Sequence, residues 1–397
     1  MLFDKKILVA ITGSIAAYKS AELIRLLKKD GAEVRVIMTE AAKEFITPLT
    51  IQAVSGHEIH DQLLDSKAES GMGHIQLAKW ADLVVIAPCS ANTMSNIVNG
   101  KAQNLLCSVL LATKAKVLIA PAMNQSMWNS IFTQNNKDIL YDAGYRILGP
   151  AEGSQACGDV GLGRMIEPDD IATAICSQFS NLFEGKKFLI TAGPTVEKID
   201  PVRYLTNRSS GKMGFALAET ANDMGADVHL ISGPVNLNIS NHINRINVET
   251  AQEMFDEVLK IIDQCDVFIG CAAVADYKPT NILVNKIKKT QESISLELTK
   301  NIDIIDYVAK HYPSKYVVGF SAETNELKKH AMEKLSRKNL DLIVANDVSR
   351  KDIAFDSSEN EVTIFSKGST ISIPKSTKMI VATRILKEIF NQNSYLH

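Results

Sequence analysis

Three residues in the first half of the chain have polar side chains that could take part in chemistry, and each lies in an unusual segment. His74 follows Gly-Met-Gly, Asn124 lies within Pro-Ala-Met-Asn-Gln-Ser-Met-Trp, and Cys157 lies among four glycines in eleven residues. An imidazole titrates near neutral pH, whereas an ordinary thiol is protonated there. Each residue alone would more often be structural, but the three together indicate an active site, with the Cys157 segment as a flexible lid.

A candidate phosphate site lies at Gly13 and Ser14, where an apolar run meets a helical pattern. Backbone N–H groups and a hydroxyl at a helix N-terminus suit a monophosphate. A second polar cluster, residues 88–93, follows another apolar run and could add hydrogen bonds to a phosphate or a planar ring. The turn lacks the G-x-G-x-x-G frame, so the pattern disfavours a NAD-dependent dehydrogenase.

The second half contains a long polar loop and several lysines that could bind a larger anion. Roughly twenty residues separate Gly193 from the next helical pattern, whereas such connections usually have two to six. The loop ends in residues 207–211, which are rich in hydroxyls and amides and could hold a phosphate at a helix N-terminus. Lys334 and Lys338 are spaced to share one helical face. No Walker A frame is present, and we interpret the remaining lysines as solvent-exposed surface: Lys288, Lys289, Lys328 and Lys329.

A strand–helix–strand plan occurs twice in the chain and positions these residues. One apolar run leads to Gly13 and a similar run leads to Gly193. An amphipathic helical pattern follows each, and each helix ends at a glycine before a new strand. The apolar segments Ala81–Pro88 and Cys265–Ala272 form a second matching pair. Such units build a parallel sheet and place ligands beyond the carboxyl ends of its strands.

The length and composition fit a reduced cytoplasmic protein with two domains. The 397 residues favour more than one core. We expect the boundary after a helix from about Asp169 to Phe183, which gives domains at 1–185 and 186–397. A net charge of −2 provides no basic field for nucleic acid or a membrane surface. Six cysteines without a C-x-x-C pair indicate neither a disulfide framework nor a zinc site. No apolar run is long enough to span a membrane, so we expect a cytoplasmic location.

The first half resembles the flavin-dependent cysteine decarboxylase family. The resemblance rests on Gly13-Ser14-Ile15-Ala16-Ala17, on His74, on the Pro-x-Met-Asn-x-x-Met-Trp element and on Ala156-Cys157-Gly158. It implies a flavodoxin-like fold that binds FMN, with an active site between the subunits of a trimer. The residues expected to bind FMN are Gly13, Ser14, Thr39, Ser90 and Asn92.

The same resemblance implies a decarboxylation whose substrate is phosphopantothenoylcysteine. His74 would assist oxidation of the substrate thiol by FMN. The thioaldehyde that forms lies β to the carboxylate and draws electrons, so CO₂ leaves readily. Asn124 would hold that carboxylate, and Cys157 would donate a proton before hydride from the reduced flavin completes the product.

The second half resembles the phosphopantothenate–cysteine ligase family over nearly its whole length. The matching elements are I-T-A-G-P-T, T-N-x-S-S-G-K-M-G, A-A-V-A-D-Y, K-I-K-K, G-F-x-A-E-T and K-N-L-D-L-I-V-A-N-D, in that order. The implied fold class is therefore α/β with two tandem parallel-sheet domains, a flavodoxin-like FMN domain followed by a Rossmann-like CTP-binding ligase domain. Fused in this order, the halves resemble the bacterial bifunctional enzymes of coenzyme A biosynthesis.

The ligase resemblance implies that CTP and Mg²⁺ convert 4'-phosphopantothenate to an acyl-cytidylate, from which the amine of L-cysteine displaces CMP. Asn207 would hold the acyl-cytidylate, Lys286 would neutralise phosphate charge, and Asn346 is a weaker candidate. The metal ligands stay open. The residues expected to contact CTP are Ala272, Asp276, Lys286, Ile302, Asp303, Ile304, Ile305, Phe320, Lys334 and Lys338.

Two positions depart from the ligase pattern. Ile302 stands where many relatives have proline, and Arg208 stands where histidine is common. The resemblances together imply a homo-oligomer of decarboxylase trimers and ligase dimers, up to a dodecamer. Two alternatives stay open: an FMN-dependent decarboxylase of another cysteine substrate, which would not need the second half, and a non-enzymatic flavoprotein regulatory subunit, whose acidic extensions this chain lacks.

Overall fold

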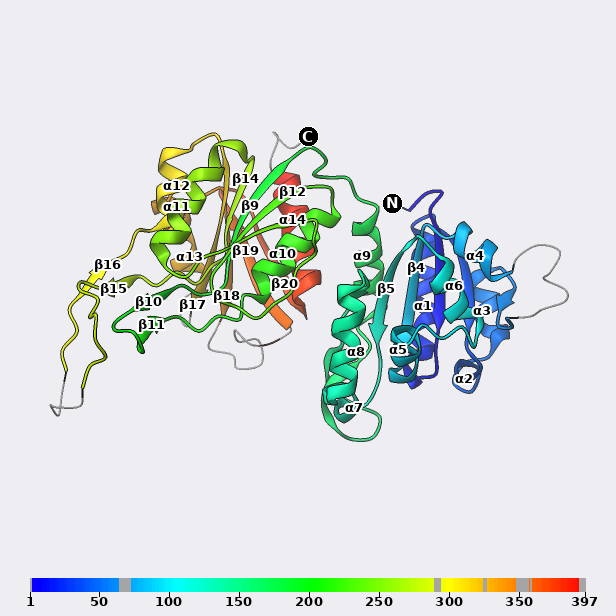
Figure 1. Cartoon of the computed structure of the whole chain (residues 1–397). Coiled ribbons are helices and arrows are strands. Elements are labelled where there is room, and N and C mark those ends of the chain that lie inside the picture. The colour runs from blue at the N-terminus through cyan, green and yellow to red at the C-terminus, as the bar shows by residue number, and fades with distance from the viewer. Residues whose placement is uncertain are drawn as a thin grey trace. The chain divides into compact units, whose positions relative to one another are not determined.

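The computed structural model describes residues 2–63, 73–288, 294–323, 327–347, 357 and 359–392. The chain forms two compact units, Met1–Phe179 and Ser180–His397, each with its own sheet and helices (Figure 1). The helix α9 (Pro168–Gln178) is shorter than predicted. Phe183 instead packs in the core of the second unit, where its backbone N–H bonds Met224. The division between the units therefore follows α9 directly.

The first unit is built on a parallel sheet in the order β3-β2-β1-β4-β5-β6. Its central strands are almost wholly apolar and buried, as expected where helices cover both faces. The strands are β1 (Lys6–Ile11), β2 (Glu33–Met38), β3 (Ile59–His60), β4 (Leu83–Cys89), β5 (Lys116–Pro121) and β6 (Arg146–Ile147). The helices before α9 are η1 (Ile15–Ala17), α1 (Tyr18–Lys29), α2 (Glu40–Lys43), α3 (Pro48–Ser55), α4 (His74–Trp80), α5 (Ala91–Val98), α6 (Leu105–Ala112), α7 (Gln125–Asn129) and α8 (Ile131–Asp142). A separate antiparallel hairpin consists of β7 (Ala151–Ser154) and β8 (Val160–Arg164).

The second unit contains an eight-stranded sheet in the order β13-β12-β9-β14-β17-β18-β19-β20. The first six strands in that order are parallel, and the last two are antiparallel to their neighbours. They are β13 (Asn244–Asn247), β12 (Asp227–Ser232), β9 (Lys187–Ala192), β14 (Val267–Gly270), β17 (Tyr316–Glu323), β18 (Leu342–Asp347), β19 (Glu359–Ser366) and β20 (Thr370–Thr377). Two short ladders join β10 (Val196–Lys198) to β11 (Tyr204–Thr206) and β15 (Tyr277–Pro279) to β16 (Leu298–Lys300).

Helices cover both faces of this second sheet. One core contains side chains of α10 (Lys212–Asp223) and α14 (Lys378–Gln392). The other contains side chains of α11 (Ala251–Ile261), η2 (Ile262–Gln264), α12 (Ile304–His311) and α13 (Leu327–Arg337). Among the described residues, no helix combines the length and the apolar character needed to cross a membrane.

The predicted internal repeat is confirmed by strand order and by a matching hydrogen bond. In each sheet the first strand of the unit lies between the second and the fourth. Asp82 accepts from the Lys6 N–H at 2.8 Å, and Asp266 accepts from the Lys187 N–H at the same distance. The two aspartates thus fasten equivalent strands together, which confirms the tandem α/β class. The antiparallel pair β19–β20, which the sequence analysis did not predict, distinguishes the second sheet.

Candidate active sites

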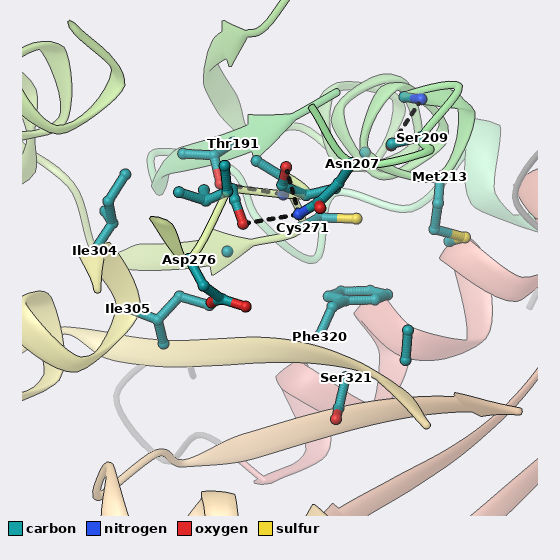
Figure 2. A pocket seen from close by; sticks show the side chains of 18 of the residues that line it. Thr191, Asn207, Ser209, Met213, Cys271, Asp276, Ile304, Ile305, Phe320 and Ser321 are labelled. Carbon is teal, nitrogen blue, oxygen red and sulfur yellow. Dashed lines mark hydrogen bonds between the residues drawn. The ribbon is translucent and has the colours of Figure 1, made fainter. Parts of the chain in front are cut away.

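A cavity of about 800 Å³ opens at the carboxyl ends of the parallel strands in the second unit (Figure 2). Strand ends supply Thr191 from β9, Gly270 from β14 and Phe320 from β17. This is the place where open parallel sheets bind ligands. Eleven of the residues predicted to contact CTP or the acyl-cytidylate line it: Asn207, Ala272, Asp276, Ile302, Asp303, Ile304, Ile305, Phe320, Lys334, Lys338 and Asn346.

Side-chain amides fix one wall of this cavity. Asn207 donates through Nδ2 to the carbonyl oxygen of Val274 at 3.0 Å, a contact drawn in Figure 2. Asn301 donates to the carbonyl oxygen of Ala275 at 2.9 Å, and the Ala275 N–H donates to Thr195 Oγ1 at 2.9 Å. The segment after β14 is therefore held on both sides, which presents its backbone and Asp276 to the cavity.

The long loop between β9 and α10 begins and ends with glycines that approach each other. Gly193 and Gly211 both have φ +73°, a conformation that residues with a Cβ rarely adopt. A Cβ on Gly211 would lie 3.4 Å from the Cα of Gly193. The two glycines therefore let the loop return to the end of β9 and place the start of α10 at the cavity.

Cationic side chains outnumber carboxylates around the cavity. The Nζ of Lys338 lies 2.6 Å from Asp303 Oδ2, and Lys334 donates to Ser321 Oγ at 3.0 Å. Asp276 and Asp303 are the carboxylates among its described lining residues. A polyanion is the ligand that such a charge balance favours. The remaining cationic lining residues are Arg208, Lys212, Lys300 and Lys378.

Several of these lining residues were missed by the sequence analysis. Lys378 begins α14, and Asn360 lies in β19, the strand that was not predicted. Both reach the cavity only because the antiparallel pair brings the end of the chain back to it. Lys212 follows Gly211 at the start of α10, so its place before an amphipathic pattern was a usable signal.

Two buried polar groups at the cavity differ in what they can do. Asn346 Oδ1 is buried and has no hydrogen-bond partner among the described residues. A buried acceptor without a partner is costly, so a ligand donor at this point would be favourable. Cys271 also lines the cavity, but burial raises the pKa of its thiol to about 12. The thiol is therefore protonated at neutral pH and is a poor nucleophile.

Lys286 does not line this cavity. Its side chain is exposed on the segment 280–288, which follows β15. The neighbouring Ile287 N–H donates to Asp200 at 3.1 Å, so this part of the segment is fastened to the turn between β10 and β11. The structure thus separates Lys286 from the other residues predicted to contact CTP.

A smaller cavity of about 200 Å³ lies at the ends of β2 and β4 in the first unit. Gly13, Thr39, Ser90 and Asn92, all predicted to bind FMN, line it. A Cβ on Gly13 would lie 2.6 Å from the Cβ of Ala41, so close packing of the turn explains the glycine. Ser14 is not among the lining residues: its Oγ accepts from the Ala16 N–H at 3.3 Å and caps the helical turn η1.

The structure brings Asn124 and Cys157 together and adds a carboxylate. Asn124 Nδ2 lies 3.2 Å from Cys157 Sγ and 2.7 Å from Asp159 Oδ2. Its Oδ1 accepts from the Ser126 N–H at 2.8 Å and caps α7, which fixes the direction of the amide. Asp159 was missed by the sequence analysis, although it is only two residues from Cys157. The amide of Asn124 is therefore already arranged to hold a carboxylate.

The Cys157 segment is a hairpin turn between β7 and β8, where the sequence analysis predicted a flexible loop. A Cβ on Gly163 would lie 2.3 Å from the carbonyl oxygen of Met123, and one on Gly161 would lie 2.2 Å from Gln125 Oε1. The Met123 N–H also donates to the Gly163 carbonyl at 2.9 Å. These glycines allow the hairpin to pack closely against the start of α7. Glycine here therefore indicates close packing and not a flexible backbone.

His74 is the first residue of α4 and is half-buried. Residues 64–72, which precede it, lie outside the described residues. Among the described residues, the hydrogen bonds of Cys157 and of the Asn124 amide go to each other and to Asp159 and Ser126, and not to His74. In this unit the predicted residues thus lie in four places: the small cavity, the Asn124–Cys157–Asp159 cluster, the turn at Ser14, and His74.

Comparison with known proteins covers both units. Residues 1–180 match the flavoprotein family, and residues 183–392 match the DNA/pantothenate metabolism flavoprotein C-terminal domain. The chain is 51% identical over 393 residues to the coenzyme A biosynthesis bifunctional protein CoaBC of Vibrio vulnificus strain CMCP6, covering 98% of each chain. It is 48% identical over 396 residues to the CoaBC protein of Escherichia coli strain K12, covering 98% of this chain and 97% of the relative. A crystal structure of the C-terminal domain of CoaBC aligns with a TM-score of 0.46 and 43% identity, over 53% of this chain and 97% of that one.

Proposed function

Because the chain belongs to the family of coenzyme A biosynthesis bifunctional proteins, we propose that its two units catalyse consecutive steps with separate sites. The predicted two-step role in coenzyme A biosynthesis is confirmed by this membership. We assign the CTP-dependent ligation of cysteine to 4'-phosphopantothenate to the second unit. The FMN-dependent decarboxylation of the product, phosphopantothenoylcysteine, is assigned to the first. The single observation that carries the assignment is the lysine-rich cavity at the strand ends of the second unit.

In the ligation, a carboxylate oxygen of phosphopantothenate attacks the α-phosphorus of CTP and diphosphate leaves. The cysteine amine then attacks the acyl carbon, and CMP leaves. Lys334 and Lys338 stabilise the phosphate charge, since both line the cavity near β17 and α12. The Asn207 amide, 3.0 Å from the Val274 carbonyl, lies at the wall where the acyl-cytidylate would be held. Lys286 is the further cation that we expect the bound phosphates to attract.

The pyrimidine and ribose would lie on the opposite wall. The backbone of Ile302–Ile305 and the side chain of Asp276 offer polar groups there, and Phe320 offers a flat apolar surface. The unpartnered Asn346 Oδ1 would accept from a ligand donor. Within the described segments no three metal-ligating side chains gather. We propose that Mg²⁺ enters with the nucleotide, since Mg²⁺ commonly binds through substrate phosphates and only one or two carboxylates.

In the decarboxylation, Gly13, Thr39, Ser90 and Asn92 would hold FMN at the small cavity, where the flavin would supply a reversible two-electron oxidation of the substrate thiol. Asn124 holds the departing carboxylate, a role for which its 2.7 Å contact with Asp159 provides a model within the chain. Asp159 would have to give up this contact when the substrate binds. Cys157, 3.2 Å from the same amide, donates the final proton. His74 assists the thiol oxidation.

The active protein is proposed to be a homo-oligomer of decarboxylase trimers and ligase dimers. Large apolar side chains on the surface are compatible with this, because contact between subunits would remove their apolar area from water. In the first unit Ile131 is 69% exposed and Phe132 is 77% exposed, and in the second Val284 is 88% exposed. Self-association would cover them. A cytoplasmic location is part of the same proposal.

The test is to give the purified protein 4'-phosphopantothenate, cysteine and CTP, and to follow phosphopantetheine, CO₂ and CMP. We expect a yellow protein that forms all three, with decarboxylation of supplied phosphopantothenoylcysteine independent of CTP. A protein that decarboxylates but forms no CMP would contradict the ligase assignment. Decarboxylation that required CTP would contradict two separate sites.

A further inference from the structure

A fully buried carboxylate lies in a part of the second unit that is otherwise exposed. Asp200 is 1% exposed, in the turn between β10 and β11. Val202 is 57% exposed in the same turn, and across from it Ile282 is 63% exposed and Val284 is 88% exposed. A buried charge needs partners, and burying one is costly unless these are supplied. The environment of Asp200 therefore has to be explained by what the carboxylate binds.

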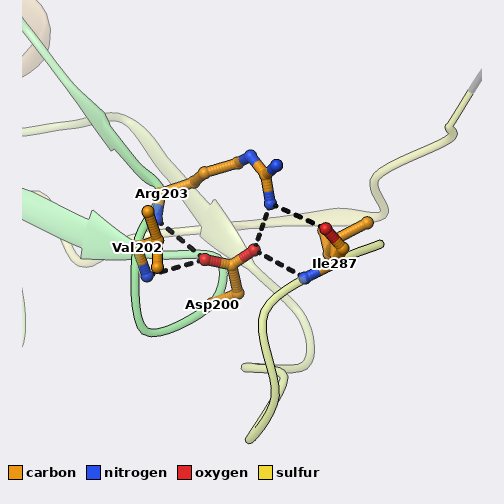
Figure 3. A network of polar contacts seen from close by, with 4 residues as sticks. All are labelled: Asp200, Val202, Arg203 and Ile287. Atoms are coloured by element: carbon orange, nitrogen blue, oxygen red, sulfur yellow. Dashed lines mark hydrogen bonds and ion pairs between the residues drawn. The ribbon is translucent and has the colours of Figure 1, made fainter. Parts of the chain in front are cut away.

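The two oxygens of Asp200 have separate partners (Figure 3). Oδ1 accepts from the N–H groups of Val202 and Arg203, at 2.7 and 2.8 Å, and so shapes its own turn. Oδ2 accepts from Arg203 Nη1 at 2.6 Å and from the Ile287 N–H at 3.1 Å. Arg203 Nη1 also donates to the Ile287 carbonyl at 3.3 Å. Oδ1 thus binds only its own turn, while Oδ2 also binds a segment that is distant in sequence.

The charge of this group is maintained over the physiological pH range. Burial would raise the pKa of Asp200, but its hydrogen bonds from Ile287, Val202 and Arg203 outweigh that effect and lower the pKa well below its usual value. The carboxylate is therefore ionised whenever the protein is folded near neutral pH. Its partner cation, Arg203, is partly exposed.

The fastened segment is continuous with the cavity wall and carries Lys286. Asp276 lines the cavity, β15 starts at the next residue, and the chain then runs through 280–288. The Leu283 N–H bonds the Ile199 carbonyl at 3.0 Å, and Ile287 bonds Asp200 four residues later. Because the side chains of 281–286 are exposed, burial contributes little to holding this stretch. Its position depends on these polar contacts.

We propose that Asp200 is a positioning residue for ligation: through Ile287 and Arg203 it anchors the segment that carries Lys286, and from this anchored segment Lys286, which lies outside the cavity lining here, reaches the phosphates of the bound nucleotide. The inference rests on the proposed function, since it requires Lys286 to act on bound CTP. Asp200 itself does not line the cavity and acts only through the segment. Without it, Lys286 would sample many positions and bind phosphate at a greater entropic cost.

The sharpest variant is Asp200→Asn. An asparagine can keep the Oδ1 contacts to Val202 and Arg203, while its NH₂ replaces the oxygen that binds Ile287 and the guanidinium. The turn would persist and the distant contact would be lost. We expect CTP to bind roughly tenfold more weakly, the loss of one charge-assisted contact. Trypsin should cleave after Lys286 and Lys288 faster than in the wild type.

The decisive measurement is a double-mutant cycle with Lys286→Gln, read as the dissociation constant of CTP. If Asp200 acts through Lys286, Asp200→Asn should weaken CTP binding in the wild type and add little in the Lys286→Gln background. Equal effects in both backgrounds would overturn the proposal. An unchanged dissociation constant in Lys286→Gln would instead remove the proposed role of Lys286, and the positioning role with it.

Controls separate this outcome from other failures. Asp266→Asn removes a carboxylate that likewise accepts a backbone N–H, from Lys187, but lies between strands. It should lower stability without any coupling to Lys286→Gln. If Asp200→Asn fails to fold, Arg203→Met removes the guanidinium that contacts both Asp200 and the Ile287 carbonyl, and it should give the same coupling. A wild-type protein that did not bind CTP at all would disprove the proposed function itself.

Discussion

The two sites differ in how completely one unit encloses them. In the second unit, eleven predicted residues from strands, loops and helices far apart in sequence converge on one cavity. In the first, the predicted residues remain apart: four line the small cavity, Asn124 and Cys157 lie together, and Ser14 and His74 lie in neither place. The same strand order and the same strand-joining aspartates underlie both. A shared fold therefore determines where a site lies but not whether one copy of the chain completes it. The dispersed arrangement in the first unit is compatible with the expectation, drawn from the family resemblance, that this site lies between the subunits of a trimer.

The largest expected effect comes from exchanging a single atom, the sulfur of Cys157, and it should change only one of the two activities. Cys157→Ser should leave ligation intact and still allow CO₂ release, but lower phosphopantetheine formation roughly 10²–10⁴-fold, the range for loss of a general acid. The hydroxyl is a much weaker acid than the thiol. Product analysis by mass spectrometry should show the decarboxylated but unreduced enethiol. Normal phosphopantetheine output would remove the acid role from Cys157.

A second variant addresses the other site. Lys334→Met combined with Lys338→Met should lower ligation roughly 100-fold or more, because two charges that stabilise the phosphates are lost and Asp303 loses its partner. Decarboxylation of supplied phosphopantothenoylcysteine should be unchanged. Lys328→Met is the matched control, since Lys328 lies exposed on the same helix and does not line the cavity. If Lys328→Met lowered ligation equally, the net charge of the protein, and not the position of Lys334 and Lys338 in the cavity, would be responsible.

A smaller effect is expected where the hairpin packs on α7. Gly163 has φ +149°, and a Cβ would lie 2.3 Å from the Met123 carbonyl oxygen, so Gly163→Ala must displace the hairpin. Such strain costs about 1–3 kcal/mol. We expect slower decarboxylation and faster proteolysis within residues 154–160, with ligation unaffected. Gly158→Ala is the control, because a Cβ there would have nothing within 4 Å, although its φ of +91° carries some strain of its own. Equal loss in both variants would favour turn flexibility over packing.

Much of the fold could be predicted because its signals are local. Apolar runs, helix-ending glycines and the matching segments Ala81–Pro88 and Cys265–Ala272 are each recognised from residues close together in sequence. The cavity contributions of Lys378 and Asn360 were hidden because they depend on the strand pair β19–β20. Likewise, the burial of Asp200 depends on Ile287, 87 residues away. A glycine can indicate either a flexible backbone or a place where another group packs too closely for a Cβ. The sequence alone did not distinguish these two cases in the Cys157 hairpin.

The smallest expected effect is that of a thiol reagent on Cys271 in the ligase cavity, which we compare with its effect on Cys157 at the other site. Cys157 is exposed, whereas burial raises the pKa of Cys271 to about 12, so that thiol is protonated well above neutral pH. Alkylation requires the thiolate. Iodoacetamide at pH 8 should therefore label Cys157 and stop phosphopantetheine formation, while Cys271 and ligation are unchanged. Peptide mapping by mass spectrometry identifies the labelled residue, and the Cys157→Ser variant shows the contribution of other thiols. Because pH 9 is still far below the pKa of Cys271, repeating the reaction at pH 9 should also leave Cys271 unlabelled. Labelling of Cys271 with parallel loss of ligation would contradict this prediction, because it would mean that water and the reagent reach the Cys271 thiol.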